Sequence, residues 1–247
     1  MKHSKMKKFG SIFLASTLLA GVLAGCGSDD DSSTDSGTSG SGGSSSAGET
    51  IKIGANLELS GGVASYGASI NEGAKLAIKE INEAGGINGK KIDYIVADNK
   101  SDNAEAVAAA TKLAVQDKVV AMIAPATSGN TIASVQIAND NKIPIVTPSG
   151  TSETITVNED GSVNDYAFRT CFIDPFQGVV AANFATEEKK KKNVAIYVDS
   201  SNDYSRELAA AFKAQIEANG GTVVAEESYV TTDVDFKPTL TNIKSEK

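Results

Sequence analysis

Residues 119–148 read VVAMIAPATSGNTIASVQIANDNKIPIVTP, and this stretch carries the pattern that decides the fold. An apolar run at 119–124 is typical of a buried strand, and a second apolar run follows at 143–146. Between them, small and hydroxyl-bearing residues lead into a segment with helical spacing at about 130–139. Two buried strands joined through a helix indicate a parallel pair, because a parallel connection needs a long crossover that is usually helical.

The same alternation of strands and helices extends along the rest of the chain. Further strands are predicted at 51–57, 92–97, 194–198 and 222–225, and further helices at about 70–81, 104–115, 176–187, 205–218 and from 236 onward. Residues 152–165 are polar and irregular, and residues 166–172 form an isolated extended run. This order predicts an α/β fold made of two doubly wound parallel-sheet lobes.

The limits of the lobes follow from where the alternation breaks and restarts. We expect lobe I at 51–170 and lobe II at 171–247, with the junction near 168–174. Lobe II has two clear strands, which are too few to cover its own sheet. We therefore expect lobe II to be incomplete in this chain.

Residues 1–25 have the features of a bacterial lipoprotein signal peptide. Four lysines precede an apolar stretch at 12–20, which is shorter than the roughly 20 residues that a bilayer span needs. The sequence LAGC at 23–26 resembles a lipobox, so cleavage would leave Cys26 as a lipid-carrying N-terminus. We expect a membrane-anchored protein on the extracytoplasmic face. The alternative is an ordinary secretory signal in which Cys26 is incidental.

Charge and composition behind the signal point to a tethered, acidic domain. Residues 26–50 are rich in Gly, Ser and Asp, which favours a flexible tether. Removal of residues 1–25 leaves 19 basic and 31 acidic residues, a formal charge of −12. Such a charge argues against nucleic acid and anionic lipid as partners. The lipid on Cys26 is therefore expected to hold the domain at the membrane.

Several classes of site are excluded by composition. Residues 26–247 contain no histidine, and Cys171 is their one cysteine besides Cys26. Ser-His-Asp triads, Cys-His dyads, His-ligated zinc and a disulfide framework are therefore excluded. The same residues contain no G-x-G-x-x-G, G-x-x-x-x-G-K-[ST], S-x-x-K or G-x-S-x-G motif. We expect no catalytic residue, no metal and no cofactor.

Four loops that follow predicted strands are rich in small and hydroxyl-bearing residues. They lie at 60–67, 126–131, 147–152 and 199–204. Ligands of open α/β sheets bind beyond the carboxyl ends of the strands, so we expect one cleft for a small ligand there. Taken singly, each loop is explained by ordinary turn and cap chemistry. Ser128, just before a helix, suits a carboxylate, which gains from the free amides and the helix dipole.

Six segments are distinctive in combination: SYG at 65–67, NEAGGINGK at 82–90, TPS at 147–149, FR at 168–169, DPFQG at 174–178, and Tyr204. Together they resemble the branched-chain amino acid (Leu/Ile/Val-type) substrate-binding proteins of ABC transporters, and the similarity runs from 51 to 247. The resemblance implies the periplasmic-binding-protein type I fold. It also implies a non-enzymatic protein whose two lobes close on a ligand through a hinge near Arg169–Ile173.

Roles for individual residues follow from the same resemblance. It implies that Ser128 and Thr151 hold the α-carboxylate and α-ammonium of the ligand. The Ser149 backbone would also contact the ligand at its α-carboxylate and α-ammonium ends. Tyr66 and Tyr204 would close over the ligand from the two lobes. The acidic residue with which this family also holds the ammonium would lie beyond the last residue of the chain.

We therefore expect a monomeric solute-binding lipoprotein. Its partners would be a small branched-chain or related amino acid, the permease of an ABC importer, and the membrane through a lipid anchor, with no nucleic acid. One alternative is a ligand-sensing domain of the same fold that reports to a receptor. A less favoured alternative is a hydrolase on the bacterial surface.

Overall fold

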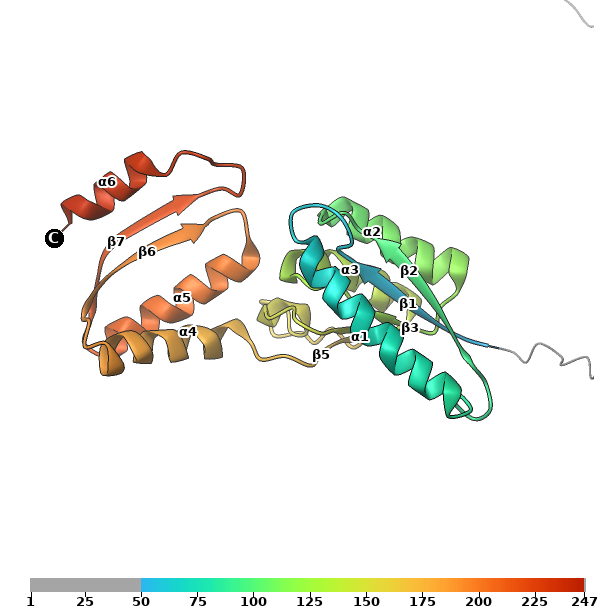
Figure 1. The fold of residues 1–247 in the computed structure, drawn as a ribbon. Coiled ribbons are helices and arrows are strands. Elements are labelled where there is room, and N and C mark those ends of the chain that lie inside the picture. Colours follow the sequence, from blue (N-terminus) through green and yellow to red (C-terminus); the bar gives the residue numbers. More distant parts are fainter. Residues whose placement is uncertain (1–49, 247) are drawn as a thin grey trace, which may run out of the picture. The chain divides into compact units, whose positions relative to one another are not determined.

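The structure is a computed structural model that describes residues 50–246 of the 247-residue chain (Figure 1). Three predictions lie wholly or almost wholly outside the described residues: the signal peptide at 1–25, the lipidated Cys26 and the tether at 26–50. Within residues 50–246, no helix combines the length and the apolar character that crossing a membrane requires.

Lobe I, for which we keep the predicted limits, is built on a five-stranded sheet with the order β2-β1-β3-β4-β5. The strands are β1 Ile51–Leu57, β2 Ile92–Asp98, β3 Ala121–Ile123, β4 Ile145–Thr147 and β5 Ala167–Arg169. All neighbouring pairs are parallel. The carboxyl ends of the strands therefore meet along one edge of the sheet, as the sequence predicts.

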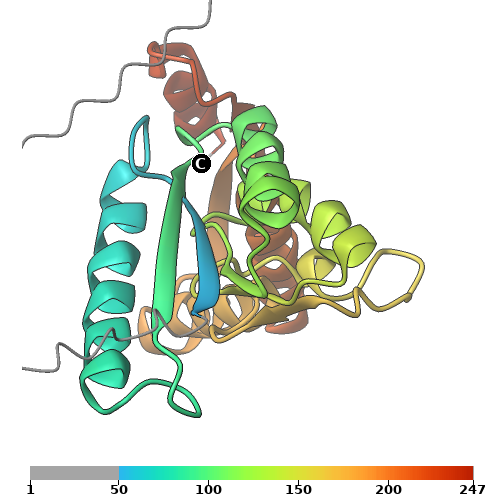
Figure 2. The ribbon, with the colours of Figure 1, turned by 90° about the vertical axis from the view of Figure 1, so that its right-hand side faces the viewer.

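Helices cover both faces of this sheet. They are α1 Ala64–Glu83, α2 Asn103–Thr111 with a π-helical extension at Lys112–Asp117, and α3 Ser128–Asn141. Figure 2 shows α1 on one face and α2 and α3 on the other. Leu57, Leu113 and Ile145 are fully buried in the resulting core. The Asp102 carboxylate begins α2 by accepting hydrogen bonds from backbone N–H groups of its first turn.

The extended run at 166–172 is not isolated, and this prediction was wrong. Within it, β5 pairs in parallel with β4, so it is the fifth strand of the lobe I sheet. The connection from β4 contains one short 3-10 helix, Glu153–Ile155, where a crossover α-helix is usual. Because no helical periodicity separates the two strands, the sequence pattern gave no sign that they are neighbours.

Two predicted helices begin earlier than their apolar spacing indicates. The helix predicted at about 70–81 starts at Ala64, and the one predicted at about 130–139 starts at Ser128. Their first turns consist of small and hydroxyl-bearing residues, which a sequence pattern does not distinguish from a loop. As a result, Tyr66 and Ser128 lie in first helical turns and not in loops.

Lobe II contains a two-stranded parallel sheet of β6 Asn193–Asp199 and β7 Thr222–Tyr229. Its helices are α4 Asp174–Asn183 with a π-helical end at Phe184–Glu188, α5 Asp203–Ala218 and α6 Lys237–Ser245. Helices α4 and α5 pack closely at Gly178, where an added Cβ would lie 2.8 Å from the Phe212 backbone nitrogen. Three apolar residues are buried in lobe II: Ala182, Ile196 and Ile216.

Candidate functional site

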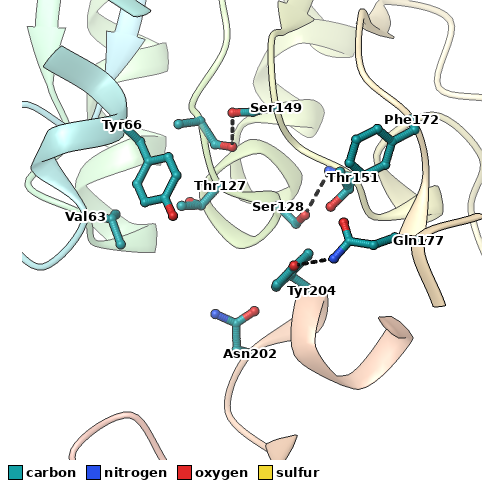
Figure 3. Close-up of a pocket in the computed structure, with 11 residues that line it drawn as sticks. Val63, Tyr66, Thr127, Ser128, Ser149, Thr151, Phe172, Gln177, Asn202 and Tyr204 are labelled. Atoms are coloured by element: carbon teal, nitrogen blue, oxygen red, sulfur yellow. Dashed lines mark hydrogen bonds between the residues drawn. The ribbon is translucent and has the colours of Figure 1, made fainter. Parts of the chain in front are cut away.

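A pocket of about 320 Å³ lies where the four predicted loops meet (Figure 3). Tyr66 lines it from the start of α1, and Ser128 from the start of α3. Ser149 and Thr151 line it from the segment after β4, and Tyr204 from the start of α5. The structure thus brings all five predicted site residues into one pocket. Their roles in binding a ligand stay predictions.

Tyr66 reaches the pocket because α1 begins very close to the end of β1. An added Cβ on Gly67 would lie 2.1 Å from the Glu58 backbone oxygen, so any other residue at 67 would push the helix away. Tyr66, one position earlier, is 61% exposed and stands at the rim of the pocket. The SYG segment is therefore explained by a close backbone approach that glycine alone permits.

Glu58 is a fully buried carboxylate beneath the pocket. Its Oε2 accepts a hydrogen bond from the Ala126 backbone N–H at 2.9 Å. Its Oε1 accepts from the Thr127 backbone N–H at 3.1 Å, the Thr127 hydroxyl at 2.9 Å and the Asn130 side-chain amide at 2.9 Å. These bonds hold the turn into α3. Sequence reasoning missed this residue, although an acidic side chain directly after a buried strand was a usable signal.

The Ser128 hydroxyl group accepts two hydrogen bonds within the protein and keeps its O–H donor for a ligand. Its oxygen accepts hydrogen bonds from the backbone N–H groups of Thr151 and Ser152, both at 3.2 Å. With both lone pairs occupied, the remaining function is the O–H donor. The N–H groups of Ser128 and Gly129, in the first turn of α3, have no acceptor among the described residues. This corner of the pocket therefore offers donors and positive helix-end potential.

The side of the pocket after β4 offers acceptors. The Ser149 hydroxyl donates to the Ala126 carbonyl at 2.7 Å, so this side chain is occupied within the protein. The Ser149 carbonyl receives no hydrogen bond from any residue in the described part of the chain. The Thr151 side chain, which is 6% exposed, also lines the pocket. A carbonyl and a hydroxyl oxygen in this position suit a hydrogen-bond donor on the ligand.

Lobe II contributes polar side chains that sequence reasoning did not single out. The Gln177 side-chain amide donates to the Tyr204 hydroxyl at 2.7 Å (Figure 3). Asn202 lines the pocket beside Tyr204, and its side chain also accepts a hydrogen bond that starts α5. Phe172 adds an apolar wall. Gln177 belongs to the distinctive segment DPFQG and Asn202 to the loop 199–204, so both lay within stretches that the sequence highlights.

A buried acidic residue lies behind the pocket at the junction of the lobes. Asp174 is fully buried, its backbone N–H donates to the Thr151 carbonyl at 3.1 Å, and neither carboxylate oxygen has a hydrogen bond of good geometry. Burial raises the pKa of Asp174 to about 6, against the lowering effect of the nearby Thr151 hydroxyl. The charge of Glu207 raises this pKa further, and the charge of Arg169 lowers it.

The pocket has the chemistry of a binding site. No group of three or more His, Cys, Asp or Glu side chains within residues 50–246 is arranged to hold a metal ion. The polar groups at the pocket are hydroxyls, backbone amides, carbonyls and carboxamides, divided into a donor side and an acceptor side. Such a division orients a small ligand that carries an acceptor at one end and a donor at the other.

Comparison with known proteins identifies the family. Residues 50–247 match the periplasmic binding protein family. The chain belongs to this family. The resemblance seen in the sequence is thereby confirmed, and so is the fold class, a periplasmic binding protein of type I with an α/β architecture and parallel sheets. The members that it resembles are described as binding proteins and not as enzymes.

Two curated relatives illustrate the similarity of this periplasmic binding protein. The Leu/Ile/Val-binding protein BraC3 of Rhizobium johnstonii is 38% identical over 197 residues, which are 80% of this chain and 52% of the relative. The leucine-, isoleucine-, valine-, threonine- and alanine-binding protein of Pseudomonas aeruginosa is 33% identical over 205 residues, 83% and 53% of the two chains. The chain spans about half the length of the curated relatives it matches.

Among solved structures, a similar one is the branched-chain amino acid transporter substrate binding protein LivJ from Streptococcus pneumoniae, crystallised in complex with isoleucine. Its TM-score is 0.73 and its sequence identity 42%, over 81% of this chain and 55% of that chain. This periplasmic binding protein therefore shares its fold with a protein that binds isoleucine.

Proposed function

We propose that this protein is the extracytoplasmic solute-binding component of an ABC importer and binds a small branched-chain or related amino acid between its lobes. The observation that carries the proposal is the polarity of the pocket. The Ser128 O–H and the free N–H groups at the start of α3 are donors that suit a carboxylate. The Ser149 carbonyl and the Thr151 hydroxyl suit an ammonium group.

The apolar part of the pocket supports an aliphatic ligand side chain. Val63, Tyr66 and Phe172 line the pocket along with the polar groups. A volume of about 320 Å³ lies at the small end of the range for ligand pockets, about 300–1,000 Å³. An amino acid with a short apolar side chain meets all three requirements: an acceptor end, a donor end and an apolar body. The relatives named for leucine, isoleucine and valine support the same ligand class.

Titration calorimetry of the intact protein tests this function. The panel contains the twenty amino acids, 4-methylpentanoate, which is leucine without its ammonium group, and 3-methylbutylamine, which is leucine without its carboxylate. We expect one or more aliphatic amino acids to bind. Both analogues should bind about 10–100-fold more weakly, since each loses charge-assisted hydrogen bonds. Absence of heat across the panel would contradict the proposed ligand class.

Thr151→Ala should weaken binding of the amino acid by about 1–3 kcal/mol, because a charged group of the ligand loses its hydroxyl partner. The same calorimetric titration measures the effect. Thr111→Ala removes an exposed hydroxyl of α2 that does not line the pocket, and serves as the control with unchanged affinity. If Thr151→Ala bound the amino acid with the same affinity as this control, the proposed role of Thr151 in ligand binding would be contradicted.

The proposed cellular arrangement rests on the sequence features of residues 1–50. In it, Cys26 carries the lipid, residues 26–50 form the tether, and lobes I (51–170) and II (171–247) deliver the ligand to the permease. Cys26→Ser should release the protein from the membrane fraction into the soluble fraction and abolish incorporation of labelled fatty acid. Retention of Cys26→Ser in the membrane fraction would argue against lipid anchoring.

A further inference from the structure

Glu207 joins lobe II to a segment of lobe I that the pocket depends on. It lies on α5 and is partly buried. Its Oε2 accepts a hydrogen bond from the Glu153 backbone N–H at 3.0 Å, and its Oε1 accepts one from the Ser152 hydroxyl. Both donors belong to the short 3-10 helix after β4 or to the residue that caps it. One carboxylate of lobe II therefore bonds two consecutive residues of lobe I.

Ser152 connects this contact with the pocket. Its side chain is fully buried, and its backbone N–H donates to the Ser128 hydroxyl oxygen at 3.2 Å. The N–H of the neighbouring Thr151 makes the same bond at 3.2 Å. The two bonds leave the Ser128 hydroxyl as a donor toward the pocket. The direction of that hydroxyl therefore depends on where the backbone at 151–152 lies.

A residue of lobe I, Arg169, also holds the backbone near residues 151–152. The Arg169 guanidinium of β5 donates to the Ser152 carbonyl at 2.7 Å and to the Gly150 carbonyl at 3.3 Å. Arg169 belongs to the same lobe as its acceptors, so its bonds do not require lobe II. The Glu207 bonds, in contrast, form when lobe II lies against lobe I. The segment at 150–153 is thus the place where the position of lobe II acts on the binding residues.

We infer that Glu207 is a positioning residue that couples the closure of the two lobes to the orientation of the Ser128 hydroxyl. The inference rests on the proposed function, in which the lobes enclose a ligand. When the lobes close, Glu207 fixes Ser152, and Ser152 together with Thr151 fixes Ser128 as a donor. When they open, this constraint on the segment is released. The Glu207 carboxylate thereby has two effects: it stabilises the closed state, and it holds the Ser128 hydroxyl in the orientation that binds the ligand.

Glu207→Ala should raise the dissociation constant of the bound amino acid about 10-fold. The change should lie in the dissociation rate constant, because a closed complex that lacks this bond reopens sooner, whereas encounter with the open form is unaffected. The matched control is Glu217→Ala, which removes the same charge from an exposed position on the same helix. Glu207→Gln, which keeps one oxygen acceptor and loses the charge, should fall between wild type and Glu207→Ala.

A double-mutant cycle with Ser152→Ala separates positioning from a general structural role. Ser152 also bonds Thr154, and the cycle cancels that contribution because it is lost with and without Glu207. We expect the loss of affinity in Glu207→Ala/Ser152→Ala to be smaller than the sum of the two single losses, because the bond that these residues share is lost only once. Additive losses, or a Glu207→Ala dissociation rate equal to that of Glu217→Ala, would overturn the inference.

A second measurement keeps the inference testable apart from the choice of ligand. Without ligand, small-angle scattering of the intact protein should give a larger radius of gyration for Glu207→Ala than for wild type and Glu217→Ala. If wild type binds nothing in the amino acid panel, the proposed function fails, and the scattering comparison still tests the bond between the lobes. Equal radii for the three proteins would contradict the role of Glu207 in closure.

Discussion

Replacing Glu58 with alanine should lower the free energy of unfolding by about 4 kcal/mol or more. Four hydrogen-bond donors lose their acceptor, and each unsatisfied donor costs about 1–3 kcal/mol when it is buried. The cavity left by the missing side chain lowers the free energy of unfolding further, so about 4 kcal/mol is the minimum expected loss. A loss of this size is a large fraction of the stability of a typical domain, which is about 5–15 kcal/mol.

Urea unfolding followed by circular dichroism measures this loss. Glu72→Ala is the control, because Glu72 is 72% exposed in its side chain and pairs with Lys75 on the surface of α1. That change should stay within about 0.5 kcal/mol of wild type. Glu58→Gln keeps the size of the side chain and should fall between the two. A Glu58→Ala variant as stable as Glu72→Ala would mean that the turn into α3 does not need the carboxylate.

Asp174→Asn should stabilise the protein at pH 7.5 by up to about 3 kcal/mol. Burial raises the pKa of Asp174 from 3.8 to about 6, a rise that corresponds to about 3 kcal/mol. The folded state therefore binds this proton more tightly than the unfolded chain does. Unfolding releases the proton between pH about 4 and 6, so the stability of the wild type falls as the pH rises through that window. Asparagine carries no charge and removes this dependence.

Unfolding curves at pH 5 and pH 7.5 test the sign as well as the size. The advantage of Asp174→Asn over wild type should be about half as large at pH 5, in the middle of that window, as at pH 7.5. Asp98→Asn provides the opposite case. Asp98 is exposed, and although desolvation acts to raise its pKa, hydrogen bonds from Ser60 and from backbone N–H groups hold that pKa below its usual value. Asp98→Asn should therefore lose stability at pH 7.5, and equal shifts in both variants would contradict the assignment.

The fold was predictable from local patterns because buried parallel strands leave continuous apolar runs. Strands β1, β2, β6 and β7 and helix α5 agree with the predicted ranges to within a few residues. Strand β5 was predicted as extended but not as part of the sheet, since its partner β4 is reached without a crossover helix. The first turns of α1 and α3 were taken for loops because they lack the apolar spacing by which a helix is recognised.

The site was predictable to the extent that its residues occupy loops after strands or carry the family resemblance. Those rules selected five residues that the structure brings into one pocket: Tyr66, Ser128, Ser149, Thr151 and Tyr204. Glu58 and Glu207 were missed for a different reason. Each acts through partners more than 50 positions away in the sequence, and no local pattern links an acidic side chain to such partners. Residues that hold a site in place are visible when burial and hydrogen bonds are known.

The small core of lobe II has a consequence for local unfolding of the protein. With Ala182, Ile196 and Ile216 as its buried apolar residues, lobe II has little to resist local unfolding, whereas the larger core of lobe I surrounds β1 and β3. Amide hydrogens of β6 and β7 should therefore exchange with solvent sooner than those of β1. A ligand held by both lobes stabilises lobe II against local unfolding, because the ligand binds only when lobe II is folded. Slowed exchange in lobe II would then report that the pocket is occupied.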